Sequence, residues 1–222
     1  MVRWLRNMFY RATLGDHSYK FLFGPEPPDE VVVLDCETTG LNPRSDEVIT
    51  VAAVVVRGNY ILTSKPYRAV IRPDKDPTST SIKVHHLRAR DVAEGRAMHE
   101  ILPELLRFIG GRPIVGYYVD FDVRMLDKYV LRYIQAKLPN RRIEVSAMYF
   151  ALKYSSAPPG TVYDLRFVSI LSDLGIPSLG QHDAFNDAVM TAMMYIQLQN
   201  MQKCGARISR TRAVYQEPPI GA

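Results

Sequence analysis

Two carboxylates at the end of an apolar run are the first residues that could do chemistry. Asp35 and Glu37 follow the run VVVL within the stretch VVVLDCETTGL, residues 31–41. Residues two apart on a strand point to the same side of a sheet, so both carboxylates are predicted to share one face, with Cys36 on the other. Adjacent carboxylates repel each other unless a cation lies between them. A single D-x-E is more commonly a solvated strand end, but the wholly apolar run before it favours a cation site.

Two later clusters add acids at positions where they need an explanation. Asp122 lies in VGYYVDFDVRML, where a short apolar strand gives way to a helix, with Asp120 as an alternative. An acid in the first helical turn is also an ordinary cap. QHDAFNDA then supplies His182, Asp183 and Asp187. Asp187 falls inside a mostly apolar helix, where a carboxylate is costly unless it is paired or bound to a metal, whereas a lone histidine there is more often structural.

Together these clusters match the chemistry of a hydrolytic metal site. Four carboxylates without a Cys/His ligand set favour Mg²⁺ or Mn²⁺ over zinc. A nearby histidine can move a proton at neutral pH. The sequence therefore predicts a two-metal phosphodiesterase site, whose members would be Asp35, Glu37, Asp122, Asp187 and His182.

The elements that must position these residues run from strands to helices along the chain. Apolar runs rich in β-branched residues predict strands, and apolar residues at helical spacing predict helices. We expect strands at 31–34, 48–56 and 63–73 as an antiparallel meander, a short strand within 110–118, and helices at 98–110, 121–134, 161–176 and 183–199. This order predicts an α/β fold with a mixed sheet.

Three regions are expected along the 222 residues. Residues 1–30 form a basic N-terminal extension that contains an amphipathic helix and ends in the proline-rich connection GPEPPDE. Residues 31–200 form the main domain, and residues 201–222 lose periodicity and form a tail. The apolar residues of the extension favour packing on the domain, but binding a partner or nucleic acid stays open.

Composition narrows the partners and the compartment. Twenty-eight Lys and Arg against 23 Asp and Glu give a net charge of +5, a mild bias toward polyanions such as nucleic acid. The two cysteines, Cys36 and Cys204, have no metal-ligand spacing, and we expect no disulfide and a reducing, cytoplasmic location. No run approaches the roughly 18 apolar residues needed to cross a bilayer, so no membrane association is expected.

The three motifs, in their order and separations, resemble the histidine branch of the DEDD exonuclease superfamily, which includes the proofreading subunit of bacterial replicative DNA polymerase. The resemblance rests on D-x-E-T-T-G-L, then F-D after a short strand, then H-x-A-x-x-D, and covers roughly residues 31–200. Asp183 stands where the sister branch has tyrosine, which favours the histidine branch. The resemblance implies a ribonuclease H-like exonuclease fold with a mixed sheet of about five strands and helices on both faces.

Residue roles follow from the same resemblance. It makes His182 the general base and the four carboxylates ligands of two Mg²⁺ or Mn²⁺ ions. IKVHHLRARDV resembles the family's short histidine-containing segment ahead of the first long helix, with His85 in the histidine position. From the residues themselves, the small side chains and glycine of TTG are expected to leave backbone N–H groups free for a phosphate or sugar. The expected substrate contacts are Thr38, Thr39, Gly40, Leu41, His85, Tyr118 and Phe121.

Two positions depart from the family pattern. Tyr117 and Tyr118 stand where many members have His-Asn, and Ser146 alone remains where many have Asp-Thr. The two tyrosines could stack on a base instead. The expected activity is metal-dependent 3′-to-5′ exonuclease action on single-stranded DNA or RNA, with DNA preferred, nucleoside 5′-monophosphates as products and a polymerase subunit as a possible partner. The alternative is a nucleic-acid-binding or polymerase-associated module without catalysis.

Overall fold

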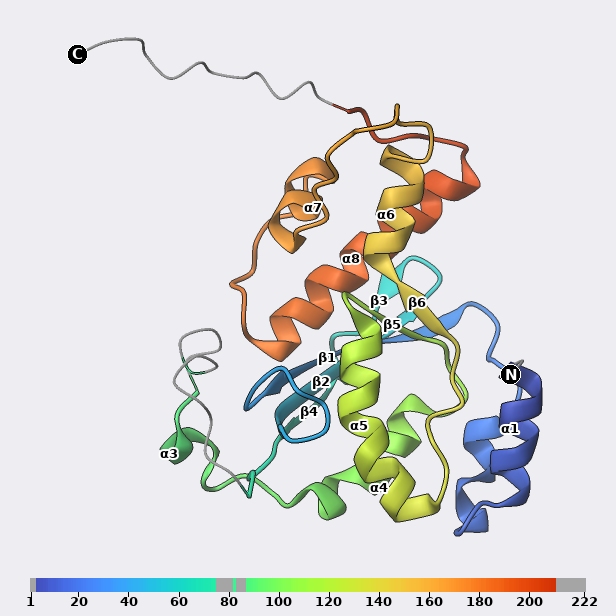
Figure 1. The fold of residues 1–222 in the computed structure, drawn as a ribbon, viewed down its shortest axis with the longest axis vertical. Coiled ribbons are helices and arrows are strands. Elements are labelled where there is room, and N and C mark those ends of the chain that lie inside the picture. The colour runs from blue at the N-terminus through green and yellow to red at the C-terminus, as the bar shows by residue number, and fades with distance from the viewer. Residues whose placement is uncertain (1–2, 75–81, 83–86, 211–222) are drawn as a thin grey trace.

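The computed structural model describes residues 3–74, 82 and 87–210, and its centre is one mixed sheet (Figure 1). The strands run in the order β3-β2-β1-β5-β6, and β4 also pairs with β2. Their bounds are β1 Glu30–Thr38, β2 Val48–Arg57, β3 Tyr60–Ile61, β4 Tyr67–Val70, β5 Ile114–Gly116 and β6 Arg142–Glu144. β1 pairs antiparallel with β2 and parallel with β5, and β3 and β4 share the outer edge of β2. Six strands thus occupy five positions, which confirms the expected mixed sheet of about five strands.

Helices cover both faces of this sheet, as predicted. One face packs against η1 (His17–Phe23), α4 (Met98–Ile109) and α5 (Val119–Ile134). The other packs against α6 (Val145–Lys153), α7 (Phe167–Asp173) and α8 (Ala184–Lys203). The short helices α1 (Arg3–Ala12) and α3 (Ala89–Val92) complete the described elements. No helix in the described ranges has both the length and the apolar character needed to span a bilayer.

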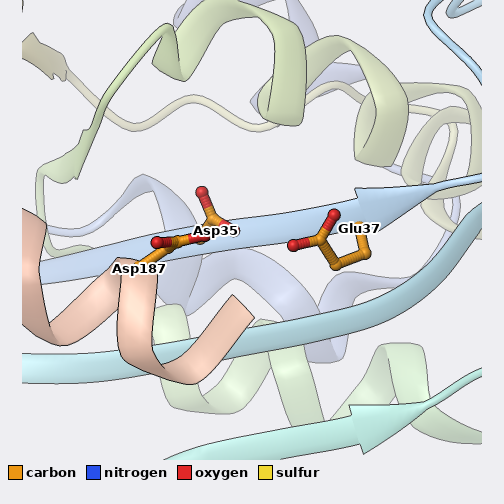
Figure 2. A group of neighbouring side chains, drawn as sticks. All are labelled: Asp35, Glu37 and Asp187. Carbon is orange, nitrogen blue, oxygen red and sulfur yellow. The ribbon is translucent and has the colours of Figure 1, made fainter. Parts of the chain in front are cut away.

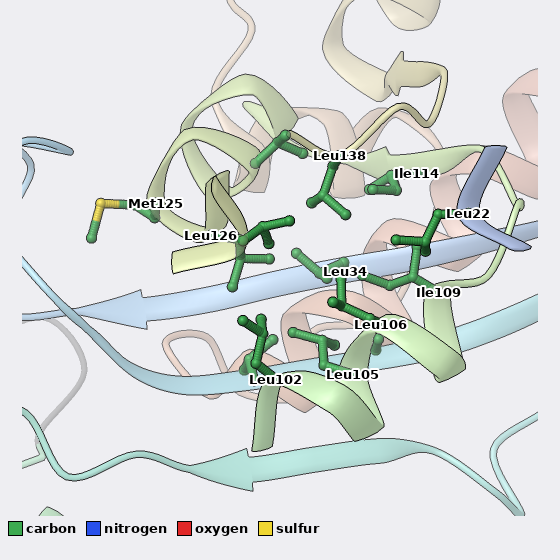
Figure 3. Close-up of a cluster of buried hydrophobic side chains, with 14 of the residues drawn as sticks. Leu22, Leu34, Leu102, Leu105, Leu106, Ile109, Ile114, Met125, Leu126 and Leu138 are labelled. Atoms are coloured by element: carbon green, nitrogen blue, oxygen red, sulfur yellow. The ribbon is translucent and has the colours of Figure 1, made fainter. Parts of the chain in front are cut away.

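The alternation of side chains along β1 divides the apolar residues between two cores. Val32 and Leu34 contribute to the core beneath α4 and α5, where Leu34 lies among Leu105, Leu106 and Leu126 (Figure 3). Val31 and Val33 contribute to the core beneath α8. Because helices cover both faces of the sheet, the sequence of β1 is continuously apolar up to its last residues, where the acids begin.

The N-terminal segment packs against the first of these cores. Leu14, Tyr19 and Leu22 are each at most 4% exposed and lie in the same cluster as α4 and α5. Among the alternatives left open by the sequence, packing on the domain therefore holds for these three residues.

The predicted helix at 161–176 is wrong in its first half, because α7 begins only at Phe167. The Asp164 carboxylate accepts a hydrogen bond from the Arg166 amide two residues on, a local bond that competes with helix formation. The Leu165 carbonyl accepts a hydrogen bond from the hydroxyl of Tyr117 on another segment. These bonds hold the segment before α7 in an irregular conformation.

Other elements differ from expectation in extent. β3 was not predicted as a strand, and the predicted third strand is limited to Tyr67–Val70, which is β4. α5 begins two residues earlier than predicted, and α8 continues four residues further, into the predicted tail. η1, β6 and α6 were not predicted. The sequence did contain a pattern that predicts α6, namely a capping residue followed by apolar residues at helical spacing. Glu144 caps the helix by accepting a hydrogen bond from the Ser146 amide at 3.1 Å, and Val145, Tyr149 and Leu152 form its buried face.

Candidate active site

Three of the predicted acids converge although two lie on β1 and the third lies about 150 residues later on α8. Ligand oxygens of Asp35, Glu37 and Asp187 all lie within 4.8 Å of one another. Figure 2 shows Asp35 and Glu37 on β1 facing Asp187 on α8. The strand alternation predicted for the first pair is therefore observed, and α8 supplies the opposite wall.

The start of α8 fixes Asp187 in this position. Asp183 caps the helix, because its carboxylate accepts hydrogen bonds from the amides of Phe185 at 3.1 Å and Asn186 at 2.9 Å. One oxygen of Asp187, Oδ2, accepts from the His182 amide at 2.9 Å. Its other oxygen, Oδ1, is buried without a hydrogen-bond partner in the described part of the chain. A bound cation would satisfy a buried carboxylate oxygen that has no hydrogen-bond partner and lies among other acids.

Asp122 lies beside this group but not within it. Asp122 is 4% exposed in the first turn of α5, and it is not among the three acids that share the 4.8 Å separation. Its charge is nevertheless the largest cause, after burial, of the raised pKa of Asp35. Asp120, the alternative acid, pairs with Arg142 at 2.7 Å and its side chain is 64% exposed. The structure thus separates the buried acid from the surface one.

The electrostatics of the cluster show that the four acids cannot all be charged at low cost. Burial raises the pKa of Asp35 and Asp122 well above the ordinary value, and neighbouring carboxylates add to the shift. Burial, together with Asp187 and Asp183, raises the pKa of Glu37 to about 7. A divalent cation would offset this repulsion. The donor set, all carboxylate oxygens, therefore fits Mg²⁺ or Mn²⁺.

His182 stands at the mouth of the site. The residue is exposed and its φ of +65° places it in the left-handed region, which costs a non-glycine residue on the order of 1 kcal/mol. Its side chain lines a pocket together with Glu37 and Asp183. Its charge also lowers the pKa of Asp187, against the larger effect of burial. The structure thus places the predicted base within electrostatic reach of the acids.

The turn after β1 is held by its own threonines. The Thr38 hydroxyl donates to the Gly40 carbonyl at 2.7 Å, and the Thr39 hydroxyl accepts from the Glu47 amide at 2.9 Å. The Thr39 amide donates to the Glu47 carbonyl at 2.8 Å, so the expectation that this amide is free for a ligand is wrong. The amides of Gly40 and Leu41 donate to no group in the described residues, and the Leu41 side chain is 85% exposed. These two positions are the available part of the turn.

Of the remaining residues predicted to contact substrate, one is exposed, one is packed against the core and one lies outside the described residues. Tyr118 is 59% exposed with a φ of +57°, and its ring centroid lies 4.5 Å from that of Tyr117. Tyr117 also makes an edge contact with Phe167 at 5.1 Å. Phe121 is partly buried against the core beneath α4 and α5. His85 lies outside the described residues.

Glu144 is a residue that the sequence reasoning missed. Its Oε2 accepts from the Val119 amide at 2.9 Å, and its Oε1 accepts from the Ser146 amide and hydroxyl at 3.1 and 2.8 Å. One carboxylate thus holds the starts of α5 and α6 together. Its contact on α5, Val119, lies three residues before Asp122. A glutamate two residues before a serine at the start of an apolar helical run was the available signal.

Comparison with known proteins agrees with this geometry. A family model described as an exonuclease, RNase_T, matches residues 32–195. The epsilon subunit of DNA polymerase III from Aquifex aeolicus is 32% identical over 170 residues, which cover 75% of this chain and 79% of that protein. The PolC-type DNA polymerase III of Thermotoga maritima is 28% identical over 199 residues, 90% of this chain but 13% of the polymerase.

A solved structure shares the fold. Escherichia coli exonuclease I, in a complex with single-stranded DNA, superimposes with a TM-score of 0.67 and 18% identity over 80% of this chain and 42% of that one. The chain therefore belongs to the RNase_T exonuclease family, with the ribonuclease H-like fold. Within that family it is a DEDD exonuclease similar to the epsilon subunit of bacterial DNA polymerase III. Membership implies dependence on a divalent metal, which the acidic cluster could hold.

Proposed function

We propose that this protein is a 3′-to-5′ exonuclease of the histidine branch that removes nucleoside 5′-monophosphates from single-stranded nucleic acid, with DNA preferred over RNA. The observation that carries the proposal is the convergence of Asp35, Glu37 and Asp187 within 4.8 Å, with the buried Asp122 beside them. A non-catalytic binding module would have no need to keep four repelling acids and a histidine together.

Asp35, Glu37, Asp122 and Asp187 would hold two divalent cations. Such cations would supply Lewis-acid activation of water and stabilisation of the charge on the phosphate and the leaving oxygen. The carboxylates would orient the cations, and Oδ1 of Asp187, which has no hydrogen-bond partner among the described residues, would be satisfied by one. The free amides of Gly40 and Leu41 would bind the terminal nucleotide.

His182 would act as the general base. An imidazole can accept a proton from the attacking water and release it to solvent. Its exposed position beside Glu37 leaves such a route open. The His182 amide donates to Asp187 from a left-handed backbone conformation, and the residue also lines the pocket beside Glu37.

Substrate preference is proposed from the relatives. The similar proteins are named as DNA polymerase III subunits or polymerases, and the structural neighbour is an exonuclease bound to single-stranded DNA. The chain spans 13% of the PolC-type polymerase that it matches. The Aquifex aeolicus relative is named as a subunit of DNA polymerase III, so association with a polymerase is part of the proposal. We also propose a cytoplasmic location, with Cys36 and Cys204 as free thiols.

Purified protein incubated with 5′-labelled single-stranded DNA and the matching RNA, in Mg²⁺, Mn²⁺ or EDTA, tests the proposal. We expect metal-dependent degradation to a ladder of shortened strands, faster on DNA than on RNA and absent for Asp187→Ala. Asp183→Asn is a useful companion, since it alters the cap of α8 without removing a proposed ligand. Intact substrate in both metals with binding retained would instead support the non-catalytic module.

A further inference from the structure

A pocket of about 450 Å³ opens directly beside the acidic cluster. Its floor is the sheet, where β2 contributes residues 50–52 and β4 contributes residues 68–70. The start of α8, residues 182–185, forms one wall, and Glu37 lies at the border with the cluster. The volume is within the range of ligand pockets.

The strand register places Arg68, which lines this pocket, on the same face of the sheet as the acids. Asp35 is opposite Ala52 in the β1–β2 ladder, and Ala52 is opposite Arg68 in the β2–β4 ladder. Residues directly opposite each other point to one side of a sheet, so Arg68 faces the same side as Asp35 from two strands, or roughly 10 Å, away. The small side chain of Ala52 between them leaves the space that the pocket occupies.

Arg68 is held in place by an aromatic ring and not by an acid. Its guanidinium carbon lies 3.2 Å from the ring centroid of Phe185, the residue two before Asp187 on α8. Arg68 is exposed and makes no ion pair within the described part of the chain. Stacking restricts the side chain while the edge of the guanidinium keeps its N–H donors available.

We propose that Arg68, stacked on Phe185, binds a phosphate group of the nucleic-acid ligand in this pocket. A planar guanidinium with free donors matches phosphate oxygens, and the ligand of the neighbouring acids is itself a phosphodiester. The inference rests on the proposed function, and it assigns to Arg68 the recognition of a second phosphate, distinct from the one that is cleaved. The released mononucleotide carries the phosphate that is cleaved at the acids, so this second phosphate belongs to the backbone of the bound strand.

Steady-state kinetics of Arg68→Gln, Arg68→Lys and the control Arg72→Gln test the inference. Arg72 is an exposed arginine four residues later that lines a different pocket. We expect Arg68→Gln to raise KM about tenfold with kcat changed less than about twofold, Arg68→Lys to fall between, and Arg72→Gln to resemble the wild type. Thermal melting of each variant establishes that it is folded.

Inhibition by a deoxynucleoside 5′-monophosphate distinguishes the backbone phosphate from the cleaved one, because the cleaved phosphate is the only phosphate that this product carries. We expect the inhibition constant to be unchanged in Arg68→Gln, and a constant that rises with KM would assign Arg68 to the cleaved phosphate and overturn the inference. Equal KM values for Arg68→Gln and Arg72→Gln would overturn the inference. If the wild type degrades no nucleic acid, the proposed function fails, and anisotropy of a labelled oligonucleotide with the same two variants still decides the role of Arg68.

Discussion

Asp120 and Asp122 are two residues apart, yet their surroundings give them different roles. Asp122 is buried beside Asp35, whereas Asp120 is a surface partner of Arg142. Replacing a residue that only supports a metal ligand typically costs 10–100-fold, so Asp122→Asn should lower kcat/KM by more than about 100-fold. Asp120→Asn should stay within about threefold of the wild type, because exposed ion pairs contribute little. Similar losses in the two variants would contradict the assignment of Asp122.

The raised pKa of Glu37 predicts an unusual pH dependence of stability in the metal-free protein. Its pKa rises from 4.5 to about 7 on folding, chiefly because of burial. The folded protein therefore keeps a proton that the unfolded chain releases, so the contribution of Glu37 to stability is fully present below about pH 4.5 and is lost as the pH rises toward about 7. Added Mg²⁺ should restore that stability at the upper end of this range, because the cation compensates the charged cluster.

Melting temperatures in EDTA and in Mg²⁺ across this range measure the effect. Glu37→Gln should flatten the EDTA profile and melt above the wild type at its upper end. The assignment fails if the EDTA melting temperature rises through the window equally in both proteins.

Residue identity alone could predict the chemistry of the site but not its assembly. The apolar run before Asp35 and the alternation of a strand were enough to place Asp35 and Glu37 on one face. The cost of burying Asp187 was visible from its apolar neighbours. The meeting of these residues depends on α8 packing across β1 and β2, a long-range contact that no local spacing encodes. The sequence analysis inferred it from the shared chemistry of the residues and from a family resemblance.

At the scale of elements, the start of α5 determines where Asp122 lies. Glu144 on β6 accepts the Val119 amide and thereby fixes the first turn of that helix. Glu144→Ala should cost about 1–2 kcal/mol of stability and should raise the Mg²⁺ concentration needed for half-maximal activity. Chemical denaturation and a metal titration of activity measure the two effects.

Glu100 provides a matched control for that experiment. Its carboxylate accepts the Ala97 amide at 3.1 Å and so caps α4, a helix that carries no predicted site residue. Glu100→Ala should lower stability modestly and leave the metal titration unchanged. An unchanged metal titration in Glu144→Ala as well would show that Glu144 serves stability alone.

Long, regular elements were predictable, whereas short and irregular ones were not. The periodicity of α4 and α8 and the apolar runs of β1 and β2 placed these elements within a few residues. The helix predicted at 161–176 failed because Asp164 and Tyr117 take up backbone groups that a helix would use. β6 is three residues long and is a strand because it pairs with β5, which is tertiary information.

At the scale of the whole molecule, the N-terminal segment forms part of the core of the domain. Leu22 is 2% exposed and packs beneath α4, near Ile109 in Figure 3, whereas Leu5 on α1 is 44% exposed. Leu22→Ala should lower the free energy of unfolding by about 2–5 kcal/mol, and Leu5→Ala by less than about 0.5 kcal/mol. Urea denaturation measures both, and similar small losses would show that the segment packs without supporting the domain.

The polarity of hydrolysis tests the central claim most directly. Two samples of one single-stranded DNA, labelled at the 3′ or at the 5′ end, are digested in Mg²⁺ and sampled from the earliest time points. The proposed function predicts that the 3′ label appears at once as a mononucleotide, while the 5′ label passes through a ladder of shortening strands. Early release of the 5′ label as a mononucleotide, or of the 3′ label on a fragment longer than a mononucleotide, would contradict it.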